Sequence, residues 1–268
     1  MIVTVTNMKG GVGKTTTSSL LAKYIAINSA SPVVLIDMDP QGGASSLFLG
    51  NQKGVTTVYD ALDEAFENGD PSELMHGSLQ KPFEDINLFV IASDKRLNQM
   101  GTNGATNDLL AYAIECADFA ANATVVIDTG TMPNLVAMGI YAADKVLIPM
   151  TMSRQTVRPT AATLGMVIRG KKELLGIFPV AAGKAQWEEK TLEAWSDRLE
   201  QLPGLSQVVG KVLQGMPSSK AIIRGGWVSG VFPKKMTPIF DNIYKELFGE
   251  SALPVVMEQQ ENAEVLNG

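Results

Sequence analysis

The sequence holds one cysteine and one histidine in 268 residues. The lone Cys116 excludes a disulfide framework and cannot hold an iron–sulfur cluster. His76 has no clustered His or Cys partner, so we expect a surface or helix-end role for it rather than a metal centre. No apolar run approaches a membrane span, and the N-terminus lacks a signal peptide. We therefore expect a cytoplasmic protein that does not bind membrane.

The composition indicates one large domain. Apolar residues make up 45% of the chain and charged residues 19%, which suits an α/β domain with a substantial core. We expect this domain to span residues 1–255. Residues 256–268 are polar and acidic, so we predict a disordered tail there.

Charge is distributed unevenly along the chain. Residues 1–150 hold 8 Lys+Arg and 16 Asp+Glu, a net of −8, whereas residues 151–240 hold 13 and 6, a net of +7. The last segment, 241–268, holds 1 and 6, a net of −5. A basic segment inside an acidic protein indicates a possible nucleic-acid footprint, with chance distribution over solvated surfaces as the alternative interpretation.

A glycine-rich loop lies between a short apolar strand at residues 2–6 and a helix pattern at 17–27. Glycines let the backbone curl so that its N–H groups point at one anion, and the helix start adds further N–H groups. In a phosphate-binding loop Lys14 would reach the β- and γ-phosphates and Thr15 would bind Mg²⁺. The predicted nucleotide-binding residues are Gly10, Gly11, Val12, Gly13, Lys14, Thr15 and Thr16.

This loop departs from the general P-loop pattern, because Met8 stands where that pattern has glycine. A second lysine, Lys9, precedes the glycine pair instead. The run resembles the deviant Walker A motif, KGGxGK[ST], of the ParA/MinD family of P-loop ATPases. The resemblance implies that Lys14 acts in cis, and that Lys9 reaches the nucleotide of the other subunit in a dimer.

Two further motifs of that family follow in order. Residues 37–43 resemble its DxDPQGN segment, which implies that Asp39 orients the attacking water and touches the Mg²⁺ shell, while Asp37 supports the metal site. Gly43 replaces the usual asparagine, so we expect a more flexible loop. The apolar strand at 123–128 resembles Walker B, which implies that Asp128 holds Mg²⁺ through water. Its following loop has Gly130 and Thr131 where the family often has prolines.

Strand and helix patterns alternate through the rest of the chain, which predicts a doubly wound, mostly parallel sheet with helices on both faces. Further strands are predicted at residues 32–37, 87–92, 144–149, 175–181 and 206–213. Further helices are predicted at residues 57–66, 72–79, 106–121, 153–170, 187–202 and 236–248.

The resemblance implies a Mg²⁺-dependent ATPase whose ATP-bound homodimer binds DNA without reading its sequence, as in plasmid or chromosome partition. DNA binding would place the protein on the nucleoid. A ParB-like or other adaptor protein would stimulate hydrolysis and so release the dimer from DNA. DNA contacts are predicted within residues 151–240. The candidates are Lys211, Lys220, Arg224, Lys234 and Lys235.

Two alternatives remain open at this stage. A positioning ATPase with a protein assembly as its cargo would have the same motifs. A metabolic P-loop enzyme, such as a dethiobiotin-synthetase-like ligase, would share the fold, although Lys9 and residues 37–43 argue against it.

Overall fold

The computed structural model describes residues 1–50, 54–67, 69–100, 107–181, 185–201 and 232–249, in which strands and helices alternate. The strands are β1 (Ile2–Val5), β2 (Val33–Met38), β3 (Leu79–Gln80), β4 (Leu88–Ile91), β5 (Thr124–Thr129), β6 (Lys145–Met150) and β7 (Glu173–Pro179). The helices are α1 (Lys14–Asn28), α2 (Gly43–Leu49), α3 (Val58–Glu67), α4 (Ser72–Gly77), α5 (Leu97–Met100), α6 (Leu109–Cys116), α7 (Phe119–Asn122), α8 (Pro133–Ala142), α9 (Arg154–Arg169), α10 (Gln186–Glu200) and α12 (Thr237–Phe248). None of these helices is both long and apolar enough to cross a bilayer.

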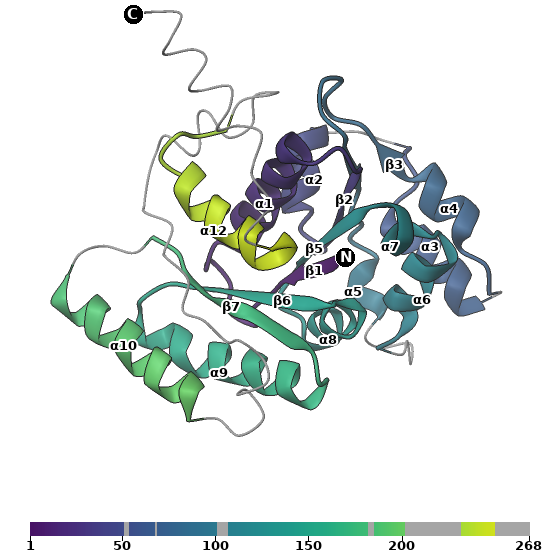
Figure 1. Cartoon of the computed structure of the whole chain (residues 1–268). Helices are drawn as coiled ribbons and strands as arrows, with labels where there is room; N and C mark the ends of the chain where they lie inside the picture. The colour runs from purple at the N-terminus through teal and green to yellow at the C-terminus, as the bar shows by residue number, and fades with distance from the viewer. Residues whose placement is uncertain (51–53, 68, 101–106, 182–184, 202–231, 250–268) are drawn as a thin grey trace, which may run out of the picture.

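In the described part of the chain, seven strands form one sheet in the order β3-β4-β2-β5-β1-β6-β7 (Figure 1). Neighbouring strands pair in parallel, except that the two-residue β3 runs antiparallel to β4. From β1 the chain winds toward one edge through β2 and β4, and from β6 it winds toward the other edge through β7. The predicted doubly wound, mostly parallel sheet is therefore confirmed.

Helices cover both faces of the sheet. Successive strand residues point to opposite sides, so each face carries apolar side chains that a helix layer buries. Helices α1, α2 and α12 pack on one face, where Leu35 and Phe240 belong to one apolar cluster. Helices α3 to α10 cover the other face, where Ile36 and Leu62 belong to a second cluster and Trp195 to a third. In Figure 1, α1 and α12 lie above the sheet and α8 and α9 below it.

Two differences from the predicted elements have local causes. The single helix predicted at 106–121 is wrong, because α6 ends at Cys116 and α7 begins at Phe119. Between them Asp118 has φ 57°, a left-handed conformation through which an α-helix does not continue. The short elements α2, α5 and β3 lack a clear periodic pattern in the sequence and were not predicted. The predicted strand at 206–213 lies outside the described residues.

Candidate nucleotide site

Loops from three neighbouring strands meet at one edge of the sheet. Strand β5 lies between β1 and β2, and its Asp128 pairs in register with Val5 on one side and Asp37 on the other. Residues that follow these strands therefore line a single cleft of about 410 Å³. Its lining consists of Gly10, Gly11, Gly13, Lys14, Thr15, Thr16, Asp39, Gln41 and Thr131. This is the edge at which open α/β sheets bind their ligands.

The glycine loop has the backbone conformation of an anion cradle. Gly11 and Gly13 have φ values of 74° and 84°, which side-chain-bearing residues rarely adopt. A Cβ on Gly13 would also lie 2.7 Å from Val180 Cγ1, so space as well as conformation requires glycine. Helix α1 begins at the next residue, and no side chain caps it. The N–H groups of its first turn therefore remain available to a bound anion.

Lys14 is buried at the base of the loop, with only 7% of its surface exposed. Its Nζ donates a hydrogen bond to the Lys9 carbonyl oxygen at 3.1 Å. Burial lowers the pKa of the Lys14 ammonium, while the charges of Asp128 and Asp39 oppose that shift. A phosphate in the cleft would add negative charge beside this ammonium and favour its charged form.

Two neighbouring buried carboxylates beneath the cleft differ in their partners. Asp37 accepts hydrogen bonds from the Ser45 N–H at 2.8 Å, the Ser45 hydroxyl at 2.7 Å and the Asp39 N–H at 3.1 Å. Burial raises the pKa of Asp37 to about 6, and these hydrogen bonds oppose the shift. Asp37 is thus occupied in holding the loop that follows β2.

Asp128 is fully buried, and neither of its oxygens accepts a hydrogen bond of normal geometry from a described residue. Burial raises its pKa well above the usual range, and the Asp37 charge raises it further. The Thr15 and Ser18 hydroxyls and Lys14 lie close enough to oppose that rise, although they do not saturate the carboxylate. Buried polar groups are normally paired, so this carboxylate fits a site that a ligand completes.

The donor set fits Mg²⁺ in particular. No group of three or more His, Cys, Asp or Glu side chains in the described ranges is placed to hold a metal by itself. Mg²⁺ does not require such a cage, because it keeps several waters and binds through one or two carboxylates and the substrate phosphates. The Thr15 hydroxyl and the Asp128 carboxylate would supply the hard oxygen ligands on the protein side.

Asp39 enters the cleft from the loop after β2 and is half-buried. Its Oδ1 accepts a hydrogen bond from the Gln41 N–H at 3.0 Å, and the Ser93 hydroxyl donates to its carbonyl oxygen. Gly130 lies directly against this carboxylate, since a Cβ there would be 3.1 Å from Asp39 Oδ1. The glycine that replaces a family proline therefore leaves the space in which the Asp39 carboxylate sits.

Gly43 has a similar relation to Thr15. We expected it to loosen a loop, but it is instead the first residue of α2. A Cβ at Gly43 would lie 3.0 Å from Thr15 Cγ2 and 3.3 Å from its Oγ1. The chain thus departs from the family pattern at two glycines, and a side chain at either position would crowd a predicted catalytic or metal-binding residue.

Comparisons with known proteins agree with this geometry. Residues 1–174 match the model of a family described as an AAA domain. Among curated relatives, the chromosome partitioning protein ParA of Myxococcus xanthus is 33% identical over 154 residues, 56% of this chain and 51% of that protein. The chromosome-partitioning ATPase Soj of Thermus thermophilus is 31% identical over 191 residues, 70% of this chain and 61% of that protein. The chain belongs to the ParA/MinD family of P-loop ATPases.

Solved structures show how widely this fold is shared. A complex of a Cyanothece McdA variant with ATP superposes with a TM-score of 0.75 at 18% identity, over 92% of this chain and 95% of that one. A cobyrinic acid a,c-diamide synthase from Mycobacterium smegmatis, with a bound ATP analogue and magnesium, superposes with a TM-score of 0.72 at 20% identity, over 94% and 97%. At these identities the similarity concerns the fold alone. The matched stretches span about half to three fifths of the two curated relatives.

Two predicted nucleotide-site residues of this ParA/MinD family member do not line the cleft. Val12 is 1% exposed, so its side chain belongs to the interior rather than to the ligand surface. Lys9 is half-buried and contributes backbone groups: its N–H donates to Asn7 Oδ1 at 2.9 Å and its carbonyl accepts from Lys14. Within the described residues its side chain is not part of the cleft wall.

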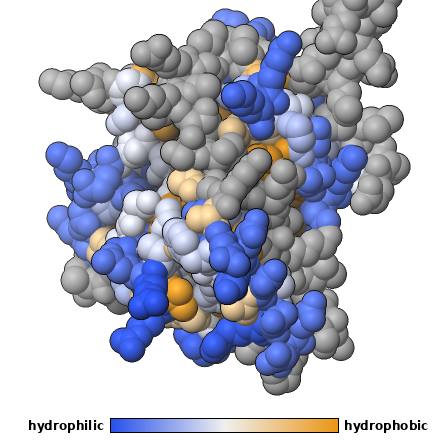
Figure 2. Space-filling view, turned by 90° about the vertical axis from the view of Figure 1, so that its left-hand side faces the viewer, coloured by the Kyte–Doolittle hydropathy of each residue, from blue (hydrophilic) through white to orange (hydrophobic). Residues whose placement is uncertain are grey.

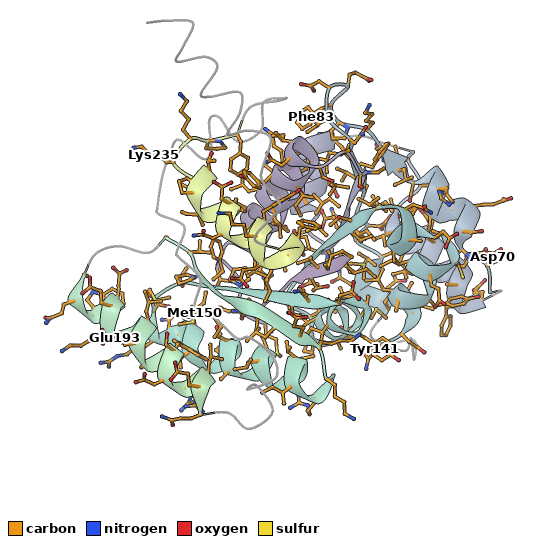
Figure 3. The ribbon with its side chains drawn as sticks, in the orientation of Figure 1. Asp70, Phe83, Tyr141, Met150, Glu193 and Lys235 are labelled. Atoms are coloured by element: carbon orange, nitrogen blue, oxygen red, sulfur yellow. The ribbon has the colours of Figure 1, made fainter. Side chains whose placement is uncertain are left out.

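Sequence reasoning missed Gln41 and Thr131, which line the cleft together with Asp39. Each follows a predicted carboxylate motif by two or three residues, and that proximity was the available signal. Of the predicted DNA contacts, Lys234 and Lys235 are exposed in the turn before α12. Figure 3 labels Lys235. Lys211, Lys220 and Arg224 lie outside the described residues.

Proposed function

We propose that this chain hydrolyses ATP in a Mg²⁺-dependent reaction and uses the cycle to partition or position a cargo. The observation that carries this proposal is the fully buried Asp128 carboxylate, which accepts no hydrogen bond of normal geometry from a described residue. It lies close to Lys14 and Thr15 at the uncapped start of α1. The free N–H groups of the helix start can bind phosphates, and the Asp128 carboxylate can bind a cation. Together they suit a phosphate chain bound with a cation.

The residues divide the chemistry between them. The N–H groups of the loop from Gly10 to Thr16 hold the phosphates, and Lys14 stabilises the charge that develops on the transferred phosphoryl group. Thr15 and, through water, Asp128 hold Mg²⁺, with Asp37 supporting the site. Mg²⁺ when bound neutralises phosphate charge. Asp39, whose carboxylate faces the cleft beside Gly130, orients the attacking water.

We further propose that ATP closes two copies of the chain face to face, with each Lys9 reaching the phosphates of the other. The exclusion of the Lys9 side chain from its own cleft wall supports a role in trans, because its backbone is anchored in cis while its ammonium is left for another partner. Removal of this ammonium by Lys9→Ala should abolish ATP-dependent dimerisation. Normal dimerisation and turnover in that variant would refute the role in trans.

In this proposal the ATP-bound dimer binds DNA without sequence preference through the basic segment 151–240, which includes Lys234 and Lys235. A ParB-like or other adaptor stimulates hydrolysis and releases the dimer from the nucleoid. The net charge of +7 in that segment and the partitioning relatives support this cycle. Charge reversal at Lys220 and Arg224 should lower DNA affinity and spare nucleotide binding, while loss of both would indicate misfolding.

The deciding experiment measures binding to plain duplex DNA with ATP, with ADP and without nucleotide, at low and high salt. We expect binding with ATP alone, weakening steeply as salt rises. ATP-dependent dimers that ignore DNA would support a protein assembly as the cargo. ATP turnover that requires a small-molecule acceptor would instead support a metabolic enzyme, as the fold of the diamide synthase admits.

A further inference from the structure

A second hollow of about 490 Å³ lies between α9 and α10, away from the nucleotide cleft. These two helices lie side by side beneath β6 and β7 at the lower left of Figure 1. The hollow is lined by Val157, Arg158, Ala161, Lys190, Thr191, Ala194, Trp195 and Arg198, which we call the α9–α10 groove. Both helices therefore contribute to it.

The floor of the groove is apolar. Val157 leaves 38% of its surface exposed, and the small side chains of Ala161 and Ala194 leave room above the buried Trp195. Trp187, which is 56% exposed, lies four residues before Thr191 and so extends the same side of α10. On the face of the molecule shown in Figure 2, small apolar patches likewise interrupt the hydrophilic surface. An apolar side chain of a ligand would bind at a partly desolvated position in this groove.

The polar lining carries one sign of charge. Arg158 comes from α9 and Lys190 and Arg198 come from α10, while no carboxylate among the described residues lines the groove. None of the three forms an ion pair with another described residue. Lys190 and Arg198 are eight residues apart, roughly 12 Å along the helix axis. That spacing is too long for one small anion and suits several carboxylates along a peptide.

The other side of α10 carries the opposite charge. The helix holds five acidic and two basic residues, and both basic residues line the groove. Glu189, Glu193 and Asp197 are exposed, and each precedes a groove residue by one position, about 100° around the helix. Figure 3 labels Glu193 on this helix. A long polyanion such as duplex DNA would meet this acidic stripe, whereas a short segment in the groove would not.

We infer that the α9–α10 groove binds an acidic peptide segment of a partner protein. An apolar side chain of that segment occupies the floor between Ala161 and Ala194, and its carboxylates pair with Arg158, Lys190 and Arg198. This is the helix-in-groove mode of recognition, with apolar anchors for affinity and charge for partner choice. The inference goes beyond the proposed function, because the groove shares no lining residue with the nucleotide cleft.

The test is a selection of short random peptides displayed on phage, against the full chain, after depletion on the R158Q/R198Q variant. We expect the enriched peptides to combine acidic residues with a large apolar one. The best of them, as a fluorescent probe, should lose about tenfold or more in affinity to R158Q/R198Q and weaken with salt. Enriched peptides without net negative charge, or with equal affinity for both proteins, would overturn the inference.

Matched variants separate the competing explanations. R169Q/K171Q removes two exposed cations beyond the groove and should leave the probe's affinity unchanged. If it lowered the affinity as much as R158Q/R198Q does, the loss would reflect net charge rather than the groove. Duplex DNA that displaces the probe, together with an equal loss of DNA affinity in R158Q/R198Q, would reassign the groove to DNA. Higher probe affinity in the full chain carrying E258Q/E261Q/E264Q would assign the groove to this chain's own acidic end instead.

Discussion

The nucleotide cleft and the α9–α10 groove are built in different ways. The cleft is lined by loop residues that follow three adjacent parallel strands, and most of them belong to short contiguous motifs. The groove is lined by side chains at helical spacing on two separate helices, with no motif in either. Backbone geometry places the cleft residues, whereas the relative placement of two helices creates the groove. A loop site can therefore be recognised in a sequence, and a helix-pair site cannot.

The largest effect should come from the cleft. Replacement of Asp39 by alanine removes the carboxylate that we propose orients the attacking water, so ATP turnover should fall by about 10²–10³-fold with nucleotide binding retained. Steady-state turnover and equilibrium nucleotide binding would be measured on the same protein. Peptide binding in the α9–α10 groove should not change, since Asp39 does not line it. A variant that loses ATP binding to the same degree would place Asp39 in binding rather than in catalysis.

A pH effect should also be confined to the cleft. The pKa of Asp37 is raised to about 6 in the folded chain, so between pH 6 and its unfolded value the native state binds a proton that the unfolded state lacks. As pH falls through 6, protonation of Asp37 therefore raises the free energy of unfolding by up to roughly 3 kcal/mol. This contribution is absent at neutral pH.

Urea unfolding without nucleotide at pH 7 and pH 5 would check this, with Asp37→Asn as the comparison. The variant should lose the gain in free energy of unfolding between the two values. An identical pH dependence in both proteins would show that Asp37 does not carry it.

Two glycines of the loop allow the cost of a steric clash to be measured apart from the cost of a positive φ. Gly13→Ala combines a positive φ with a Cβ only 2.7 Å from Val180, and should lower the free energy of unfolding by about 2–3 kcal/mol. Gly11→Ala has a positive φ but nothing within 4 Å, and should cost about 1 kcal/mol. Adding Val180→Ala should recover part of the first loss. Equal costs at both glycines in chemical denaturation would remove the steric argument.

A smaller effect is expected where Gly130 borders Asp39. Gly130→Ala places a Cβ about 3.1 Å from the carboxylate oxygen and should displace it by a few tenths of an ångström. We expect kcat to fall by roughly three- to thirtyfold, with little change in KM for ATP, because a misplaced group costs rate more than binding. An unchanged kcat would mean that the Asp39 carboxylate has room to adjust.

The smallest effect separates the two regions most directly. R158Q/R198Q changes exposed cations on the groove, and its free energy of unfolding should stay within about 0.5 kcal/mol of the wild type. ATP turnover without partner should likewise be unchanged. A clear loss of either would mean that these arginines support the fold or the cleft.

Much of the fold was predictable, because strong apolar strand patterns such as residues 32–37 and 123–128 correspond to buried strands. Prediction was poorer where local geometry overrides periodicity. The left-handed Asp118 splits one predicted helix into two, and Gly42–Gly43, which reads as a turn, leads into α2. The predicted residues Lys14, Thr15 and Asp39 do meet in one cleft, whereas the Val12 side chain turns inward.

By itself the sequence determined the family, the alternation of strands and helices, and the loop that can bind phosphate. These follow from local rules, since strand periodicity, glycine conformation and a lysine beside a helix start act over a few residues. Only the tertiary structure decided that Asp37 is saturated while its neighbour Asp128 is left unpartnered, and that two distant cations of α10 share a groove with Arg158. Partners and burial depend on which strands and helices become neighbours, and that information is spread over the whole chain.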